Sequence, residues 1–168
     1  MKLFFITLLW LFTTFSSFAA SIEEIVSIET GTGKLEGTLV TGDLKSSKTV
    51  ALIIAGSGPT NRDGNNPTMI NNSLKMLASE LAKVGISSLR YDKRGVGKSS
   101  SAGLKEVDLR IDNYINDASS WIEYLNNLSR FNKIVVIGHS EGSLIGMVAS
   151  QKKNVDKFIS IAGPGQPI

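Results

Sequence analysis

The sequence predicts a single domain of the α/β class, built on a mostly parallel sheet with flanking helices. The segments at residues 49–55 and 133–137, which are apolar after a first Thr and a first Lys, are typical of strands buried on both faces of such a sheet. Segments of helical periodicity lie between these runs, and strands that alternate with helices pair in parallel through helical crossovers. The length of 168 residues, with 42% hydrophobic and 20% charged residues, fits one globular domain.

The N-terminus has the layout of a secretory signal peptide over residues 1–19. Lys2 precedes an apolar stretch, and small side chains at Ser17 and Ala19 suit cleavage after Ala19. A membrane anchor is the alternative, but a span needs about 20 apolar residues, and Thr and Ser interrupt this stretch early. We therefore expect residues 20–168 to form an exported domain, periplasmic or secreted, with no stable membrane span.

The mature chain opens with a predicted hairpin. Residues 22–28 and 34–40 have strand-like patterns, and a glycine-containing turn at 31–33 joins them. The buried strand at 49–55 follows. Residues 56–67 are rich in Gly, Asn and Pro and are expected to form a loop.

Helical spacing of leucines predicts a helix over residues 72–84, which Gly85 ends as a C-cap residue. A short strand at 86–91 and a glycine-rich turn at 94–100 come next. A long amphipathic helix then has its apolar face at Ile111, Tyr114, Ile115, Ala118, Ile122, Leu125 and Leu128. The last predicted elements are the strand at 133–137, a short helix at 142–150 and a strand at 157–162.

The composition excludes several classes of function. The net charge of +3 comes from scattered basic residues, so no nucleic-acid partner is expected. The absence of cysteine excludes disulfides, thiolate catalysis and cysteine-based zinc sites. With only one histidine in addition, we expect neither a metal site nor a cofactor.

The candidate nucleophile is Ser140, in the sequence Gly138-His139-Ser140-Glu141-Gly142. This G-x-S-x-G pattern lies between a buried strand and a helix, which is the setting of a nucleophile elbow. Such a turn is so tight that side chains at the two flanking glycines would clash. The helix that follows directs its N-terminus at the site, so the Glu141 N–H is expected to stabilise an oxyanion. The alternative is a plain turn between strand and helix.

A second motif, Ala55-Gly56-Ser57-Gly58-Pro59, follows the first buried strand. Together with the elbow, it resembles the α/β-hydrolase superfamily, in particular its serine aminopeptidase and monoacylglycerol-lipase-like branch. Such enzymes carry an H-G-x-G loop here, and the resemblance implies that Ser57 supplies the second oxyanion N–H, with Gly56 and Gly58 in structural roles. Ala55 replaces the histidine of that loop. Residues 61–65 resemble a family extension folded over the acyl site.

A third motif, residues 92–99 (DKRGVGKS), resembles the D-x-R-G-x-G-x-S turn of the same family, whose role is structural. A phosphate-binding loop is the competing interpretation, because Gly97-Lys98-Ser99 ends like a G-x-x-x-x-G-K-S motif after a strand. The first glycine of that motif would fall on Asp92, whose carboxylate repels phosphate. The nucleotide-binding hypothesis is therefore disfavoured.

The remaining triad members are missing from the sequence. In this fold the order is Ser, then Asp or Glu, then His, yet His139 is the only histidine and adjoins the nucleophile. We expect it to pack or bond beneath the turn. Asp156 precedes the last predicted strand, at the wrong edge of the sheet. The sequence therefore predicts a hydrolase domain cut short after its sixth strand, and it leaves open a frameshifted gene, a partial sequence, or a half that joins a separately encoded C-terminal half.

The resemblance implies a serine hydrolase that acts on ester, thioester or amide bonds of small acyl or peptide substrates through an acyl-enzyme on Ser140. Esterase is the first choice. The rival is a catalytically inactive remnant or binding module, because losing the base removes several orders of magnitude of rate.

Overall fold

A computed structural model describes residues 21–43, 45 and 47–165. The predicted signal peptide lies outside the described residues. In the part of the chain that is described, no helix is long and apolar enough to cross a membrane.

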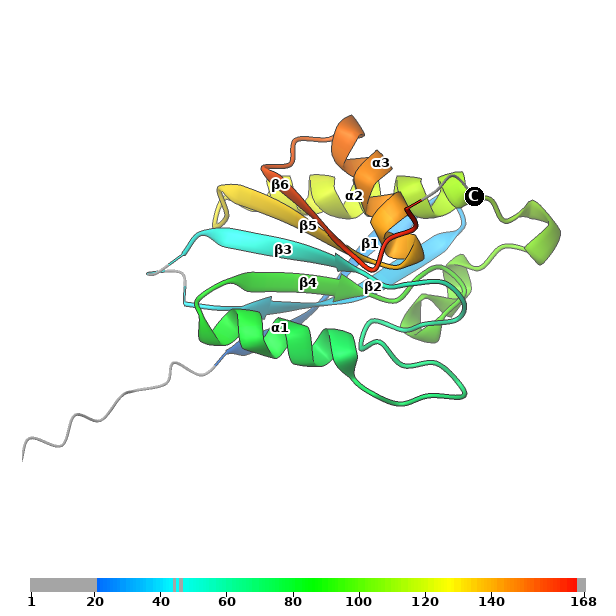
Figure 1. The fold of residues 1–168 in the computed structure, drawn as a ribbon. Helices are drawn as coiled ribbons and strands as arrows, with labels where there is room; N and C mark the ends of the chain where they lie inside the picture. Colours follow the sequence, from blue (N-terminus) through cyan, green and yellow to red (C-terminus); the bar gives the residue numbers. More distant parts are fainter. Residues whose placement is uncertain (1–20, 44, 46, 166–168) are drawn as a thin grey trace, which may run out of the picture.

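The centre of the domain is a twisted sheet of six strands in the order β1-β2-β4-β3-β5-β6 (Figure 1). The strands are β1 (Ile22–Thr30), β2 (Gly33–Thr41), β3 (Thr49–Ile54), β4 (Ser87–Tyr91), β5 (Lys133–His139) and β6 (Lys157–Ile161). The four neighbouring strands β4, β3, β5 and β6 are parallel. The strands β1 and β2 form an antiparallel hairpin, and β2 pairs antiparallel with β4. The predicted hairpin and mostly parallel sheet are thus confirmed.

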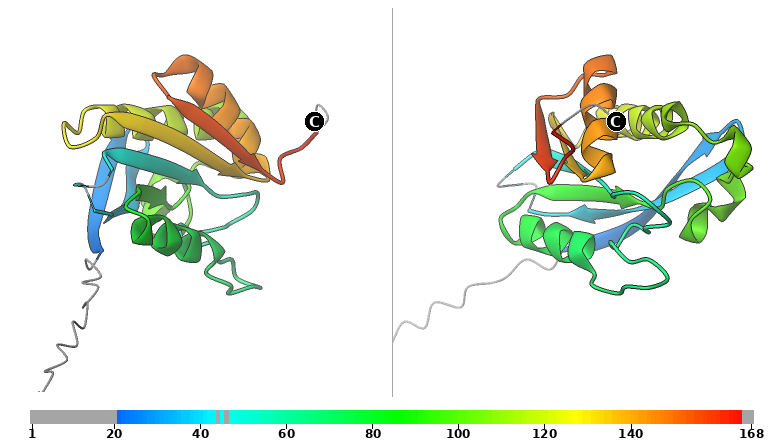
Figure 2. Two further views of the ribbon diagram at one scale, coloured as in Figure 1. Left: turned by 60° about the vertical axis from the view of Figure 1, so that its left-hand side comes forward. Right: turned by 45° about the vertical axis from the view of Figure 1, so that its right-hand side comes forward.

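Helices cover both faces of this sheet (Figures 1 and 2). Helix α1 (Ser73–Lys83) packs on one face against β4. Helices α2 (Ile111–Asn126) and α3 (Glu141–Lys152) contact each other on the opposite face. Each lies within about two residues of its predicted bounds, except that the apolar pattern of α2 continues two residues beyond the helix to Leu128.

The β3 strand shows why a continuously apolar run was needed. Val50, Leu52 and Ile54 belong to the core beneath α2 and α3. Ala51 and Ile53, which alternate with them, belong to the core beneath α1. Because successive side chains of a strand point to opposite faces, a strand with a helix layer on each side buries all of them.

Gly85 ends α1 as predicted. Its φ of 80° lies in the left-handed region that favours glycine. From this position its N–H donates to Ala82 O at 3.0 Å, and the N–H of Ile86 donates to Leu81 O at 2.9 Å. These bonds satisfy carbonyls of the last helical turn and direct the chain into β4.

One connection differs from the prediction, and the outer strand has an exposed apolar surface. Short 3₁₀ helices, η1 (Gly97–Ala102) and η2 (Glu106–Asp108), occupy a region that was expected to be only a glycine-rich turn and a connection. The outer strand β6 pairs with β5 along one edge, and Ile159 and Ile161 on it are 44% and 40% exposed. These side chains form an exposed apolar strip beside the carboxyl end of β5.

Candidate active site

Ser140 lies on a sharp turn between β5 and α3. Its φ of 53° and ψ of −122° are rare for a residue with a side chain, so the backbone is strained there. Two bonds hold the turn in place: Ser140 N donates to Ile161 O at 2.9 Å, and Ser143 N donates to Ser140 O at 2.9 Å. The turn is therefore fixed by β6 on one side and by α3 on the other.

The two glycines of the turn are required by close backbone contacts. A Cβ on Gly142 would lie 2.5 Å from the carbonyl oxygens of Ile54 and Ala55. A Cβ on Gly138 would collide with the Gly142 carbonyl oxygen and would lie 2.5 Å from the Cα of Ser143. The turn therefore closes only if both positions lack a side chain.

The turn brings Ser140 to the same cavity as Ser57. This cavity has a volume of about 200 Å³. Its walls come from the β3–α1 connection, the first turn of α1 and the end of β5: Gly56, Ser57, Thr60, Gly64, Asn66, Met69, Asn71, Ser73, Leu74, His139 and Ser140. The structure therefore brings together the two serines that the sequence paired by resemblance alone.

Glu141 is the first residue of α3. The N–H groups in the first turn of a helix have no carbonyl partner within the helix. The helix dipole adds a partial positive charge at the same end. The backbone next to Ser140 can thus receive a developing negative charge.

The loop before Ser57 packs closely on the elbow. A Cβ on Gly56 would lie 3.2 Å from both the Cβ of Ser140 and Nδ1 of His139. Gly58 has open space around it, but its φ of 71° favours glycine. A side chain at position 56 would therefore press on the elbow, and the backbone conformation at position 58 favours glycine.

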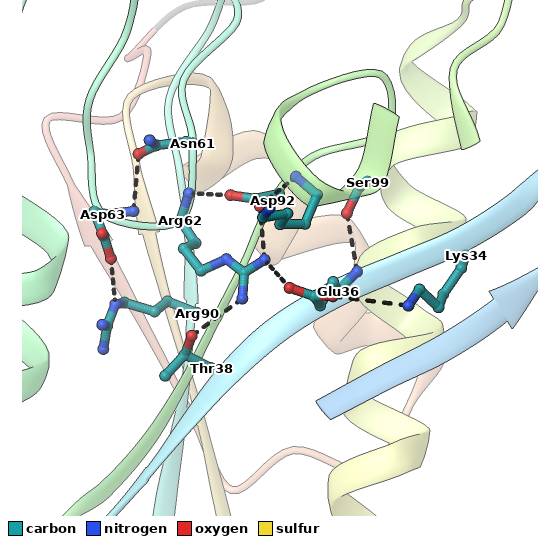
Figure 3. A network of polar contacts seen from close by, with 10 residues as sticks. Lys34, Glu36, Thr38, Asn61, Arg62, Asp63, Arg90, Asp92 and Ser99 are labelled. Atoms are coloured by element: carbon teal, nitrogen blue, oxygen red, sulfur yellow. Dashed lines mark hydrogen bonds and ion pairs between the residues drawn. The ribbon is translucent and has the colours of Figure 1, made fainter. Parts of the chain in front are cut away.

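The loop beyond Ser57 is anchored to the sheet by Arg62, a residue to which the sequence assigned no role (Figure 3). Its guanidinium donates to Oδ2 of Asp92 at 2.7 Å, to Oε1 of Glu36 at 2.8 Å and to Oγ1 of Thr38 at 3.1 Å. The side chain is mostly buried beneath the loop. Arg62 thus connects the cavity wall to β2 and to the end of β4.

Neighbouring residues complete this anchor. Asp63 accepts a bond from Nε of Arg90 at 3.0 Å, and Arg90 belongs to β4 (Figure 3). Oδ1 of Asn61 accepts from the backbone N–H groups of Asp63 and Asn65, each at 3.0 Å. The extension at residues 61–65 is therefore a rigid turn tied to two strands, beside the cavity.

Asp92 occupies the inside of the turn that was compared with a phosphate-binding loop. Its carboxylate accepts from the backbone N–H of Lys98 at 3.0 Å, and a Cβ on Gly97 would lie 2.6 Å from it. Burial alone would raise the pKa of Asp92, but hydrogen bonds from Arg62 and Lys98 lower it below the ordinary value. The protein's own anion thus takes the place that a phosphate would need. This supports a structural role for the turn.

Lys93 follows Asp92 and is buried, with 2% of its surface exposed. Its Nζ donates to Gly56 O at 2.6 Å and lies 3.7 Å from Oε2 of Glu141. The ring of Tyr114 is 5.4 Å from the ammonium. Burial lowers the pKa of Lys93, and the nearby Glu141 carboxylate opposes part of that shift. Sequence reasoning gave this lysine no role.

Arg94, the third residue of the turn, forms a buried pair with Asp117 of α2. Its Nε and Nη2 donate to the two carboxylate oxygens at 2.8 Å and 2.5 Å. The third guanidinium nitrogen, Nη1, donates hydrogen bonds to Oγ1 of Thr32 and to the carbonyl oxygen of Ala102. Arg94 therefore fixes α2, η1 and the β1–β2 turn to one another.

The expectation for His139 was wrong. It was expected to pack or bond beneath the turn, but its side chain is exposed and borders the cavity. The physical reason is the pleat of β5. Ile137 is buried on the α1 side, and His139, the last residue of the strand, points the same way one residue beyond the pairing of β5 with β3.

Asp156 lies at the edge of the sheet that the sequence predicted for it. Asp156 bonds the backbone N–H of Ile134 at the start of β5, which is the far end of the sheet from Ser140. Asp117 is held by Arg94. Within the described ranges, no cluster of three or more His, Asp or Glu residues could hold a metal ion.

The sheet order and the strained serine turn place this chain in the α/β-hydrolase fold class. The family described as serine aminopeptidase, S33, matches residues 71–164, which is more than half of the 168 residues. The chain belongs to this family of α/β-hydrolases. The esterase EstD of Thermotoga maritima is 26% identical over 117 residues, which make up 70% of this chain and 27% of that protein.

Solved structures agree on the fold. The match to a lidless α/β serine hydrolase from Xanthomonas campestris has a TM-score of 0.69 at 21% identity, and it covers 87% of this chain and 64% of that protein. The match to an α/β serine hydrolase homologue from Coxiella burnetii has a TM-score of 0.66 at 23% identity, and it covers 84% of this chain and 63% of that protein. The chain thus spans about a quarter of the curated esterase and less than two thirds of these structures.

Proposed function

We propose that this chain carries the nucleophile and oxyanion half of a serine hydrolase that cleaves carboxylic esters through an acyl-enzyme on Ser140. The observation that carries the proposal is the strained Ser140 turn, which opens onto a cavity that it shares with Ser57. A serine held at positive φ costs energy, and such strain persists where the surrounding structure enforces it for a function.

In the proposed reaction, Oγ of Ser140 attacks the ester carbonyl carbon. The carbonyl oxygen becomes an oxyanion, which the N–H groups of Ser57 and Glu141 stabilise. The intermediate collapses, the C–O bond to the alcohol breaks, and the alcohol leaves with a proton. Water then attacks the acyl-enzyme, releases the carboxylic acid and restores Ser140. Thioesters and amides have the same carbonyl and are the alternative substrates.

Each proton transfer in this scheme requires a base. His139 is the residue directly before the nucleophile, and the acids Asp117 and Asp156 are engaged elsewhere. We propose that the acid and histidine come from polypeptide outside these 168 residues, as a continuation or as a separately encoded half. The exposed Ile159 and Ile161 on the free edge of β6 give such a segment a surface to cover.

The dimensions and lining of the cavity favour a short acyl group. Its volume of about 200 Å³ is below the usual range of about 300–1,000 Å³ for pockets that hold drug-sized ligands. Hydroxyl and amide side chains of Thr60, Asn66, Asn71 and Ser73 line it beside Met69. We therefore expect acetyl esters to react better than long-chain esters.

The similarity to the esterase EstD favours esterase activity over peptidase activity. The description of the family as a whole names an aminopeptidase, so peptidase activity is the alternative. We also propose that the protein acts after export, because of the signal-like sequence at residues 1–19.

Labelling with a fluorophosphonate probe tests the nucleophile. The probe reacts covalently with activated serines, and mass spectrometry of the digested protein locates the adduct. We expect slow labelling at Ser140, abolished by Ser140→Ala and unchanged by Ser120→Ala, a matched change at an exposed serine of α2. Equal labelling of the parent and the Ser140→Ala variant would refute the proposal.

The inactive-remnant hypothesis is tested by turnover. Without a base, the 168-residue chain should hydrolyse p-nitrophenyl acetate barely above background. The coding DNA downstream, read in three frames, should encode an Asp and then a His after further strand-like runs. Efficient turnover that Ser140→Ala abolishes would show instead that the chain already contains a base.

A further inference from the structure

The carboxyl ends of β4, β3 and β5 meet at one edge of the sheet, because these three strands are parallel neighbours. The segment after β4 contributes Lys93, the segment after β3 contributes Gly56 and Ser57, and the turn after β5 contributes Ser140 and Glu141. Lys93 therefore has to reach across the end of the middle strand to come near Glu141.

The Gly56 carbonyl that accepts the Lys93 bond belongs to the same peptide unit as the Ser57 N–H. A peptide unit is planar, and in its trans form the C=O and the N–H point in opposite directions. The described chain contains no cis peptide bond. Fixing the Gly56 carbonyl at 2.6 Å from the ammonium therefore fixes the direction of the Ser57 N–H.

The surroundings of the peptide indicate which side faces the substrate. Ser57 and Ser140 line the cavity, whereas Lys93 is buried and is not among its lining residues. The ammonium thus lies behind the Gly56–Ser57 peptide, and the N–H is directed away from it. A charged donor on the carbonyl also polarises the peptide, which strengthens the hydrogen bond that its N–H can give.

The second partner of Lys93 concerns the other oxyanion donor. The Glu141 carboxylate would place a negative charge near the carbonyl oxygen that becomes negative during the reaction. The ammonium, 3.7 Å from Oε2 of Glu141, offsets that charge. One buried cation thus acts on both residues whose backbone N–H groups are proposed to bind the oxyanion.

We propose that Lys93 is a positioning residue for oxyanion stabilisation, which orients and polarises the Gly56–Ser57 peptide from behind and neutralises the carboxylate of Glu141. The inference rests on the proposed function, since it presupposes that the Ser57 and Glu141 N–H groups receive the oxyanion. Lys93 does not touch the substrate in this scheme. Its effect reaches the reaction through the peptide that it holds.

The first part of the test needs no reaction. The ¹⁵N shift of an amide responds to hydrogen bonding at the preceding carbonyl, so the Ser57 amide reports on the Lys93 bond. We expect Lys93→Met to move the Ser57 resonance and Lys93→Arg to retain most of its position. Lys98→Met, an exposed lysine of the same turn, should leave it unchanged. An unmoved Ser57 resonance in a folded Lys93→Met variant would overturn the inference.

The second part uses the fluorophosphonate, whose phosphonyl oxygen occupies the oxyanion position once Ser140 is labelled. The labelling rate should fall by about ten- to a hundredfold in Lys93→Met. Removing an oxyanion donor altogether lowers the rate by about a hundred- to a thousandfold, and a donor that is only misdirected should cause part of that loss. Lys93→Arg should restore much of it. If Lys93→Met is poorly folded, the double variant with Glu141→Gln removes the unpaired carboxylate and should still label slowly.

The outcomes separate the two proposals. Ser140-dependent labelling at the parental rate in Lys93→Met, or a rate in Lys93→Arg no better than in Lys93→Met, would overturn the role of Lys93 and leave the nucleophile intact. Absence of Ser140-dependent labelling in the parent chain would refute the proposed function, and the oxyanion role of Lys93 with it, even if the Ser57 resonance responds.

Discussion

Arg62 and Asp92 hold the cavity wall to the end of β4 through two bonds. The backbone N–H of Arg62 donates to Oδ1 of Asp92 at 2.8 Å, and its guanidinium donates to Oδ2 at 2.7 Å. Both side chains are largely buried. The position of the loop therefore depends on an ion pair that forms between a loop and a turn 30 residues apart.

Replacing Arg62 should destabilise the protein. Arg62→Met leaves the buried carboxylate of Asp92 without its charged partner, and we expect a loss of about 2 to 4 kcal/mol in the free energy of unfolding. Urea titration measures it. Lys83→Met, which breaks the exposed pair with Glu80 on α1, is the control and should leave the urea midpoint nearly unchanged. Equal midpoints for the parent and Arg62→Met would contradict the anchoring role.

The stability that Asp92 provides should depend on pH. The hydrogen bonds from Arg62 and Lys98 outweigh burial and lower the pKa of Asp92 in the folded state. Such a group stabilises the fold above its unfolded pKa of about 3.9, and the contribution is lost as pH falls through the lower, folded pKa. We expect the difference in unfolding free energy between parent and Asp92→Asn to stay level near neutral pH and to shrink below about pH 4. A difference independent of pH would argue against this ionised state.

The Gly142→Ala variant tests the backbone contact beneath the elbow. A Cβ there would lie 2.5 Å from two carbonyl oxygens of the β3 end, which cannot move without shifting the sheet. We expect a loss of about 1 to 3 kcal/mol, as for other overpacked sites, together with loss of fluorophosphonate labelling. Gly31→Ala, where no atom lies within 4 Å of the new Cβ, is the control. Normal labelling in Gly142→Ala would show that the turn tolerates a wider geometry.

ATP should not bind to the turn at residues 92–99. The Lys98 N–H already donates to Asp92, and the next element is the short 3₁₀ helix η1 rather than an α-helix. We expect no shift in the thermal unfolding midpoint with ATP and magnesium, in the parent or in Lys98→Ala. A stabilisation by ATP that is lost in Lys98→Ala would restore the nucleotide-binding hypothesis.

The elbow could be predicted from the sequence because its parts are contiguous. Gly138, Ser140 and Gly142 lie within five residues, and the strand before them and the helix after them have distinct periodicities. Arg62 and Lys93 could not be assigned in the same way. Their partners lie 30 and 37 residues away, and a lysine or arginine in a polar loop is normally solvated.

The sequence by itself determined the order and type of most elements and the sharp turn at Ser140, because hydrophobic periodicity and glycine's freedom from Cβ contacts act locally. Only the tertiary structure decided that β4 lies between β2 and β3, that His139 is exposed at the cavity, and that the ammonium of Lys93 lies behind the Ser57 peptide. Those relationships depend on which strand ends meet. Strand pairing is a long-range choice, made by the packing of whole helices on the two faces of the sheet.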